Sequence, residues 1–481
     1  MDISRFLCVL SLFFSTLVSL IALPHAAFAQ AGGEREHFDA GWRVTLPPVG
    51  PGYGAAFLPE DAAPPITDWV EPNAPGVLGI GFDTDNPRPV GSDRTRYFNA
   101  QGNFYDRPQR EISLHWNGRE IANRLCPVSL TAPSGNAVRL HLDYVPGGAD
   151  LTLAVDGATV YDHFFVAQAV PSKSRFTVGG AKPVSLTTHW SGKGFVGVKP
   201  VSVLAFDKAL NDGKHYKADG EATFPASADG IGRVVCTLTL DSTLAGLDPW
   251  DRIGHVWLYD DSGEAFEVIR YITPYRKAWE WKVDVTDLLP LLQNKKKLQV
   301  DCETYAQGWL VSVRFDFYPG KLPRVPYRVV NLWNGFYDVG NGDKPFADTV
   351  TPKTVPTDKE TIAARTRITV TGHGQNEDDL GEFAPLWRKV HSGGRTWENT
   401  LWKTDVYLNP CRPQGGTWKF DRAGWAPGSV VLPWEIDLTG VLKPGTPLDV
   451  AYELQPYRKK TEKSAPARHF LASQVILYRK G

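Results

Sequence analysis

The sequence predicts an all-β protein made of three β-sandwich domains. Short stretches in which apolar and polar residues alternate recur along the chain, and turn-forming pairs such as Asn117-Gly118 and Asp156-Gly157 follow several of them. No long stretch shows the apolar period of an amphipathic helix. The length of 481 residues fits two to four domains, and 42% hydrophobic residues can supply a core to each of them.

The net charge and the aromatic content narrow the class of partner. A formal net charge of −1 gives no basis for attraction to nucleic acid or to a membrane surface, and we expect neither as a partner. The chain has 16 tryptophans, which is a high number. They indicate exposed aromatic contacts in addition to core side chains.

The first 29 residues are predicted to be a secretory signal peptide. Arg5 precedes the apolar run Phe6–Leu23, and Ala27-Phe28-Ala29 has the small-residue pattern of a cleavage site. We expect cleavage after Ala29 and a mature chain that is secreted or periplasmic. The run is also long enough for an uncleaved membrane anchor. Because no second run of that length occurs, the mature chain is expected to be soluble.

The cysteines are few and widely separated. Apart from Cys8 in the signal segment they are Cys126, Cys236, Cys302 and Cys411, and no CxxC pair occurs. A zinc or redox motif is therefore not expected, and we predict no metal and no cofactor. One or two disulfides could form in an oxidising compartment, and the spacing leaves their pairing open.

The first predicted domain, residues 30–195, has the pattern of a sandwich of short antiparallel strands. Within residues 77–180, "GIGFDT", "EISLHWNG", "LHLDYVPGGADLTLAVDG" and "SRFTVGG" resemble strands of concanavalin-like lectin and laminin-G sandwiches. The resemblance implies an accessory domain with a carbohydrate or glycoprotein ligand. A structural spacer and a sandwich without a ligand site are the alternatives. Asp83, Asp85 and Asn86 could bind calcium, but a plain Asx turn is the simpler explanation.

The rest of the chain predicts two further sandwiches. Residues 181–200, rich in Gly, Ser, Thr and Lys, indicate a junction, and Gly320–Pro326 indicates a linker between a second domain at 201–322 and a third at 327–481. One short helical turn is expected at Asp287–Leu292. The strands predicted here are 234–240, 254–259, 266–271, 298–303, 311–317, 365–371, 401–407, 429–437, 448–454 and 470–479.

The tripeptide Trp250-Asp251-Arg252 is the first candidate for a functional site. An aromatic face can stack on a sugar ring, a carboxylate can activate water, and a guanidinium binds oxygen atoms with a rigid fork of donors. A salt-bridged pair at the start of a strand is the better explanation of the tripeptide taken alone, because structural ion pairs are common.

A set of separated sequence blocks in a fixed order strengthens the case for a functional site at Trp250-Asp251-Arg252. From Lys208 to the C-terminus the blocks are "DGEATFPA", "WDRIGHVWLYDDSGEAFEVIRYITPY", "KVDVTDLLPLL", "DCETYAQGW", "VSVRFDF", "TVTGHG", "GEF" and "DRAGWAPG". They resemble the peptide-N-glycosidase F family over about 270 residues, a signal far above any single motif. The resemblance implies two adjoining jelly-roll sandwiches with the site in the cleft between them. N-glycosylated proteins or glycopeptides would be the substrates.

The resemblance also implies roles for individual residues. The essential aspartate of the family matches Asp251, and its two functional glutamates match Glu303 and Glu382. We take these three as candidate catalytic residues. Substrate-binding roles fall on Trp250, Arg252, Tyr305, His373, Phe383, Arg422 and Trp425.

The chain departs from the family pattern at several of these positions. Tyr305, Phe383 and Thr371 stand where the family's type protein carries tryptophan, and of these threonine cannot stack on a sugar. Leu380, Ala384 and Ala426 replace cysteines, so the loop around Glu382 must be held without those disulfides. The acidic residues Glu377, Asp378 and Asp379 lie close to Glu382 in the sequence, so they are alternative matches to the family's second functional glutamate.

Each candidate has a simpler explanation when taken singly. Glu303 reads as a surface carboxylate at a strand end, Glu382 as part of a solvated acidic loop and His373 as a satisfied histidine beside a glycine turn. The ordered set of blocks outweighs these explanations for Asp251 and Glu303. For Glu382 it leaves the functional and the simpler explanation about equally favoured. Hydrolysis of a glycosylated asparagine amide needs an activated water and stabilisation of the developing charge, which carboxylates beside an arginine such as Arg252 can supply.

Three other functions compete with the amidase. A glycosidase also uses two carboxylates, but it cleaves at the anomeric carbon. A secreted glycan-binding protein with a decayed amidase cleft is the non-enzymatic alternative, and the presence of Asp251, Arg252, Glu303 and Arg422 argues against it. A copper monooxygenase on paired jelly rolls needs clustered histidines and a methionine sulfur. The one methionine is Met1, and the histidines are scattered, for example His215, His255, His373, His391 and His469.

Overall fold

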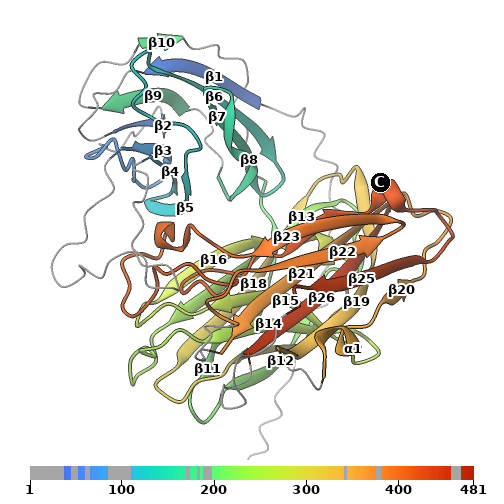
Figure 1. Cartoon of the computed structure of the whole chain (residues 1–481). Coiled ribbons are helices and arrows are strands. Elements are labelled where there is room, and N and C mark those ends of the chain that lie inside the picture. The colour runs from blue at the N-terminus through green and yellow to red at the C-terminus, as the bar shows by residue number, and fades with distance from the viewer. Residues whose placement is uncertain are drawn as a thin grey trace, which may run out of the picture.

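The computed structural model shows a nearly all-β fold, and in the part of the chain that it describes six antiparallel sheets form three sandwiches (Figure 1). The predicted all-β fold class is thereby confirmed. The structure describes residues 37–44, 52–59, 66–84, 110–169, 174–180, 185–187, 198–340, 344–374, 381–456 and 467–481. The predicted signal peptide at 1–29, Asp85 and Asn86 of the calcium hypothesis, and the acidic residues 377–379 lie outside these ranges.

The first sandwich packs a sheet of order β10-β1-β6-β7-β8 against one of order β5-β4-β3-β2-β9. Asn117-Gly118 joins β4 to β5 and Asp156-Gly157 joins β7 to β8, all four residues with the positive φ that tight hairpins need. These two predicted turns are confirmed. The strands are β1 His37–Val44, β2 Tyr53–Pro59, β3 Leu78–Asp83, β4 Glu111–Trp116, β5 Arg119–Leu125, β6 Asn136–Val145, β7 Gly148–Val155, β8 Ala158–Ala167, β9 Ser174–Gly180 and β10 Ser185–Thr187.

The second sandwich pairs a sheet of order β11-β18-β13-β16 with one of order β12-β17-β14-β15. Apolar side chains alternate toward its core, as in Trp309 to Phe317, where every second residue is buried. Its strands are β11 Val201–Asn211, β12 Lys217–Thr223, β13 Ile231–Asp241, β14 Ile253–Tyr259, β15 Ala265–Ile272, β16 Trp279–Asp284, β17 Lys295–Cys302 and β18 Trp309–Pro319.

The third sandwich pairs a sheet of order β19-β26-β21-β24 with one of order β20-β25-β22-β23. One short helix, α1 at Phe346–Thr349, lies beside it, and β25 coincides with the predicted strand. Its strands are β19 Arg324–Val339, β20 Lys353–Val355, β21 Ala363–His373, β22 Leu386–Ser392, β23 Arg395–Leu401, β24 Trp434–Asp437, β25 Leu448–Leu454 and β26 Ala467–Lys480.

The local predictions fail mainly between β23 and β24. The strand expected at 401–407 is wrong, because Val406–Leu408 forms a 3₁₀ turn whose apolar side chains are buried without a sheet partner. The strand expected at 429–437 is only Trp434–Asp437. The helical turn expected at 287–292 is a 3₁₀ turn at Thr286–Leu288. Residues 402–433 thus form a long, mostly irregular segment, a kind that often carries function.

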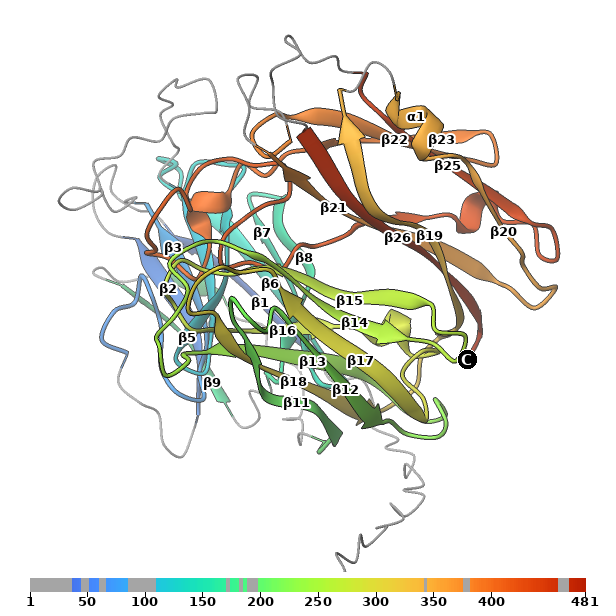
Figure 2. The ribbon, with the colours of Figure 1, turned by 90° about the horizontal axis from the view of Figure 1, so that it is seen from below.

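The apolar core of the second sandwich extends into the third. Ala363, Ile476 and Tyr478 of the third sandwich belong to the same buried cluster as the strands of the second. Residue Tyr271 of β15 also forms a bridge with Val430 of the irregular segment. Figure 2 shows β14 and β15 facing β21 and β26 across this boundary. A continuous apolar interface holds the two sandwiches in one orientation.

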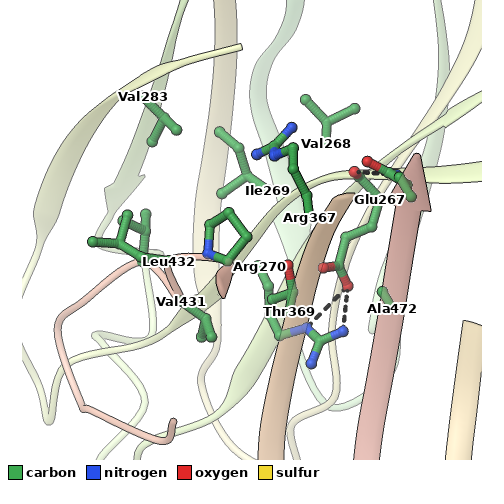
Figure 3. A pocket seen from close by; sticks show the side chains of 13 residues that line it. Glu267, Val268, Ile269, Arg270, Val283, Arg367, Thr369, Val431, Leu432 and Ala472 are labelled. Atoms are coloured by element: carbon green, nitrogen blue, oxygen red, sulfur yellow. Dashed lines mark hydrogen bonds and ion pairs between the residues drawn. The ribbon is translucent and has the colours of Figure 1, made fainter. Parts of the chain in front are cut away.

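A buried ion pair lies at the same boundary. The Arg270 guanidinium of β15 donates to the Glu267 carboxylate at 2.7 and 2.9 Å, and Figure 3 shows this pair beside a narrow groove. The groove has a volume of about 30 Å³ and none of the candidate site residues lines it. Arg270 also donates to Thr371 at 3.0 Å and to the Phe470 carbonyl at 2.7 Å. It therefore ties β15 to both β21 and β26 of the third sandwich.

Charged groups join the first sandwich to the other two. Arg412 donates to the Glu120 carboxylate at 2.5 Å, and the Arg119 guanidinium lies 3.7 Å from the ring centre of Trp279. Arg233 in turn lies 3.9 Å from the ring centre of Phe165. The predicted domain limits at 30–195, 201–322 and 327–481 stay predictions.

Neither a disulfide nor a membrane-spanning helix occurs among the residues that the structure describes. Cys126, Cys236, Cys302 and Cys411 are all buried and free, so they form none of the disulfides considered above. No helix among the described residues has both the length and the apolar character needed to cross a membrane.

Burial of Glu111 predicts a pH-dependent stability. Burial raises the pKa of this carboxyl from 4.5 to about 7, so the folded chain holds a proton that the unfolded chain releases. The free energy of unfolding is expected to fall by about 3 kcal/mol as the pH rises from about 4.5 to about 7. Glu111→Gln should remove most of this fall in denaturant titrations of the full chain at several pH values. The exposed-site variant Glu398→Gln should retain it; equal behaviour of the two variants would contradict the assignment.

Candidate active site

The pairing of β14 with β17 brings the first two candidate carboxylates to one end of a sheet. Gly254 of β14 lies opposite Cys302 of β17 in an antiparallel pair. The residues just before β14 and just after β17 therefore meet, and these include Asp251 and Glu303. The sequence separates the two acids, and the register of the sheet brings them together.

A buried aspartate fixes the loop that presents Asp251. Asp248 is fully buried, and its carboxylate accepts a hydrogen bond from the Trp250 amide at 2.8 Å and one from the Thr304 hydroxyl. The Arg252 guanidinium lies 3.5 Å from the same carboxylate. One side chain thus ties the loop before β14 to the loop after β17.

Arg422 joins carboxylates from the two sandwiches. Its Nη1 donates to Oδ2 of Asp251 at 3.1 Å and also to Oε1 of Glu382. Its Nη2 donates to the Thr417 carbonyl at 2.6 Å and to the Thr417 hydroxyl at 2.5 Å. The side chain of Arg422 is fully buried, so these charge-assisted bonds are shielded from water. Two acids that would repel each other are held on a single cation.

The backbone of the irregular segment is fixed at the same place. Arg422 and Lys403 exchange backbone hydrogen bonds at 2.9 and 3.2 Å, and the Ala423 amide donates to the Glu382 carbonyl at 2.8 Å. Neither contact needs a disulfide. They hold the loop around Glu382 in a chain where Ala384 and Ala426 replace cysteine.

Asp251 has two further neighbours. The indole Nε1 of Trp425 donates to its Oδ2 at 2.8 Å, and the side chain of Asp251 stays 15% exposed. Tyr275 lies beside it, and burial together with the charge of Asp251 raises the pKa of the tyrosine to about 12. Tyr275 is therefore a neutral hydroxyl at neutral pH. Asp251 is positioned by donors but still reaches solvent.

One open cavity of about 310 Å³ contains all three candidate carboxylates. Of the residues predicted to bind substrate, Arg252, Tyr305, His373 and Trp425 line it, and Arg422 lies behind it in contact with two of the acids. The sequence reasoning missed four lining residues: Ile253, Tyr275, Phe336 and Thr417. Ile253 and Tyr275 lie within one of the quoted blocks, whereas Phe336 and Thr417 carried no signal.

Glu303 differs from the other two acids because it is exposed. The Tyr305 hydroxyl donates to its Oε1 at 3.0 Å, and Tyr305 is itself 78% exposed. The Arg252 guanidinium lies 5.2 Å from the centre of the Tyr305 ring. This group forms a polar, aromatic rim at the mouth of the cavity.

His373 is an uncharged wall of the cavity. Burial, and then the nearby Arg270 charge, lower the pKa of His373 to about 3. Its ring meets Phe336 and Trp425 edge to face, with centroids 4.9 and 5.0 Å away. Its Nε2 lies 2.8 Å from the Thr371 hydroxyl. At neutral pH this histidine offers a ring and a hydrogen bond, and no charge.

Comparison with known proteins identifies the family. Residues 343–476 match the family model described as "Peptide-N-glycosidase F, C terminal". Peptide-N(4)-(N-acetyl-β-D-glucosaminyl)asparagine amidase F of Elizabethkingia miricola is 30% identical over 278 residues, which are 53% of this chain and 78% of the relative. The chain belongs to the peptide-N-glycosidase F family. The resemblance seen in the sequence is confirmed.

Solved structures agree with this membership of the peptide-N-glycosidase F family. Recombinant peptide:N-glycanase F matches with a TM-score of 0.53 and 26% identity, over 59% of this chain and 96% of that chain. PNGase F from Flavobacterium meningosepticum, described as a glycosylasparaginase, matches with a TM-score of 0.52 and 26% identity, over 58% of this chain and 96% of that chain.

Besides Arg422, two further residues predicted to bind substrate do not line the cavity, and neither does Thr371, which stands where the family pattern has a tryptophan. Trp250 is 58% exposed and lies outside the lining, and Phe383 packs with its ring centre 5.0 Å from the Arg422 guanidinium. Thr371 is fully buried under Arg270. The roles of Trp250 and Phe383 in binding stay predictions. Within the described ranges, no three His, Cys, Asp or Glu side chains group as a metal site.

Removal of Arg422 should destabilise the protein strongly. Arg422→Met leaves two carboxylates side by side with no cation, and loss of one partner from a buried ion pair typically costs about 3–5 kcal/mol. The free energy of unfolding measured with denaturant checks this.

Arg365→Met is a matched control for that variant. Arg365 also bridges carboxylates of both sandwiches, Asp287 at 3.2 Å and Glu435 at 3.3 Å, but its side chain is 43% exposed. Its loss should reduce the free energy of unfolding by less than about 1 kcal/mol. If the two variants lose the same free energy of unfolding, the burial of Arg422 is not the reason why its ion pairs stabilise the protein.

Proposed function

We propose that this chain hydrolyses the amide bond between an asparagine side chain and the first N-acetylglucosamine of an N-glycan. The products are an aspartate in the peptide and a glycosylamine. Family membership supports the class of reaction. The observation that carries the proposal is the Asp251 carboxylate, which opens into the cavity while Arg422 and Trp425 hold one of its oxygens.

Asp251 is the group that activates water in this proposal. Amide hydrolysis forms a bond from the water oxygen to the carbonyl carbon and breaks the bond from that carbon to the glycosyl nitrogen. A carboxylate fixed by donors on one oxygen can orient a water molecule with little rearrangement during the reaction. The water loses one proton toward Asp251, and the leaving nitrogen gains one proton to become the glycosylamine.

The two glutamates act as hydrogen-bonding or acid groups around the amide. Glu382 shares Nη1 of Arg422 with Asp251, so a change in charge on one acid is felt by the other. Glu303 lies at the rim with Tyr305 and beside Arg252, where sugar hydroxyls can bind both donors and acceptors. Arg252 positions the substrate oxygen atoms by its fork of donors.

The proposed substrate also suggests where the chain acts and what its first sandwich does. N-glycosylated proteins are substrates met outside the cytoplasm, and the proposed signal segment at residues 1–29 sends the chain there. The first sandwich, at 30–195, is an accessory unit with a carbohydrate or glycoprotein ligand in this proposal. Its ties to the other sandwiches through Arg412 and Arg119 would keep it beside the catalytic cleft.

Incubation with a denatured high-mannose glycoprotein tests the proposal. Mass analysis in heavy-oxygen water should show peptide asparagine converted to aspartate with one solvent oxygen, together with a released glycan that keeps both core N-acetylglucosamines. Asp251→Asn should lower this release at least about a thousand-fold while the chain still folds and unfolds cooperatively. Asp261→Asn, at a side chain that is 87% exposed and outside the cavity, should leave the rate unchanged.

Other outcomes of the same experiment separate the competing functions. A peptide that retains one N-acetylglucosamine would identify a glycosidase and contradict the amidase. Binding of the glycopeptide without any release would identify a glycan-binding protein. Full activity of Asp251→Asn would remove that residue from the mechanism.

A further inference from the structure

We propose that Phe336 is a sugar-stacking residue of this cleft, which binds a ring of the N-glycan through its exposed face. The inference rests on the proposed function and names a specificity residue for it. Phe336 lines the cavity that holds Asp251, yet 54% of it is exposed. An exposed phenylalanine in a cavity otherwise rich in polar groups suits a ligand with both apolar ring faces and hydroxyls, such as a sugar.

The sheet of the third sandwich explains why the ring stands there. Phe336 of β19 lies opposite Phe470 of β26, and Phe470 lies opposite Thr371 of β21. Side chains directly paired across strands point to the same face of the sheet. Along this row the exposure rises from a fully buried Thr371 through Phe470 at 6% to Phe336 at 54%. The row therefore begins in the interface of the two sandwiches and ends in the cavity.

Phe336 rests on a rigid support. Its ring stacks on that of Phe470, with centroids 4.5 Å apart and planes 18° apart. The Arg270 guanidinium lies 4.2 Å from the centre of the Phe470 ring and donates to the Phe470 carbonyl at 2.7 Å. Phe470 covers one face of Phe336, and 54% of the residue is nevertheless exposed, so we infer that the opposite face is open to the cavity.

The other aromatic side chains of the cavity are less suited to this role. The indole of Trp425 is tied to Asp251 by its N–H, next to the proposed reacting bond. Tyr305 stands on a loop at the rim and is 78% exposed. Thr371, the buried member of the row, has no ring. Only Phe336 combines an open ring face, a position on a strand and support from behind among the described cavity residues.

The position of Phe336 relative to Asp251 indicates which part of the ligand it meets. Asp251 contacts Trp425, Trp425 contacts the ring of His373, and that ring contacts Phe336. Two successive ring contacts thus separate Phe336 from the carboxylate. Phe336 therefore lies beyond the sugar attached to the cleaved amide and beside a sugar further along the glycan.

The test compares binding of N,N′-diacetylchitobiose to the full chain and to three variants by titration calorimetry. Phe336→Ala and Phe336→Leu should both raise Kd about five-fold, because neither offers a ring face, and Phe336→Trp should restore binding. With a chitobiose-bearing glycopeptide as substrate, KM should rise by a similar factor while kcat changes little. Leu432→Ala is the control, since Leu432 is 72% exposed but lines the groove of Figure 3 and not this cavity.

The variants separate stacking from support. If Phe336→Leu binds chitobiose as well as the unaltered chain and only Phe336→Ala is weakened, the ring merely fills space over Phe470 and the proposal is overturned. Unchanged Kd in all variants, or no chitobiose binding by the unaltered chain, also overturns it. If chitobiose binding depends on Phe336 but no glycan is released, the stacking role stands and the amidase proposal fails.

Discussion

The Arg422 guanidinium between Asp251 and Glu382 is the interaction on which the rest of the site depends. The two acids come from different sandwiches and meet on one nitrogen atom of a fully buried cation. Without that cation, desolvation and like charge would both oppose their approach. The Thr417 carbonyl and hydroxyl and the bridge to Lys403 hold Arg422 itself. Through Arg422, the irregular segment 402–433 thus connects the two sandwiches across their boundary.

Ion pairs that connect two sandwiches keep their geometry only if the sandwiches do not move relative to each other. Apolar side chains of the third sandwich join the core of the second, and Arg270 adds hydrogen bonds to Thr371 and to Phe470 that cross the same boundary. Catalytic groups that are contributed by different units must keep sub-ångström positions, which loops alone rarely provide. Here the strands supply the rigidity, and the loops supply the acids at the strand ends.

The sequence predicted the fold class and many strands because alternation and hairpin turns are local signals. It did not predict segment 402–433, whose apolar residues at Val406–Leu408 are buried without a sheet partner and so mimic a strand. The acids were found by resemblance, since no local pattern tells that residues 251 and 303 meet at one sheet end. Phe336 was missed for a related reason. No strand was predicted around residue 336, and only the pairing of Phe336 with Phe470 places its ring at the cavity.

The distribution of charge in the cleft follows from the same arrangement. His373 lies close to Arg270 and is buried, so its pKa of about 3 keeps it neutral while the cations pair with acids. A neutral imidazole between two aromatic rings leaves the cavity wall apolar on one side, and Asp251, Glu303 and Glu382 make it acidic on the other. A glycosylated asparagine has the same two-sided character, with an amide to be attacked and sugar ring faces to be held. Because the apolar side comes from the third sandwich, and Asp251 and Glu303 come from the second, neither sandwich alone would retain the site.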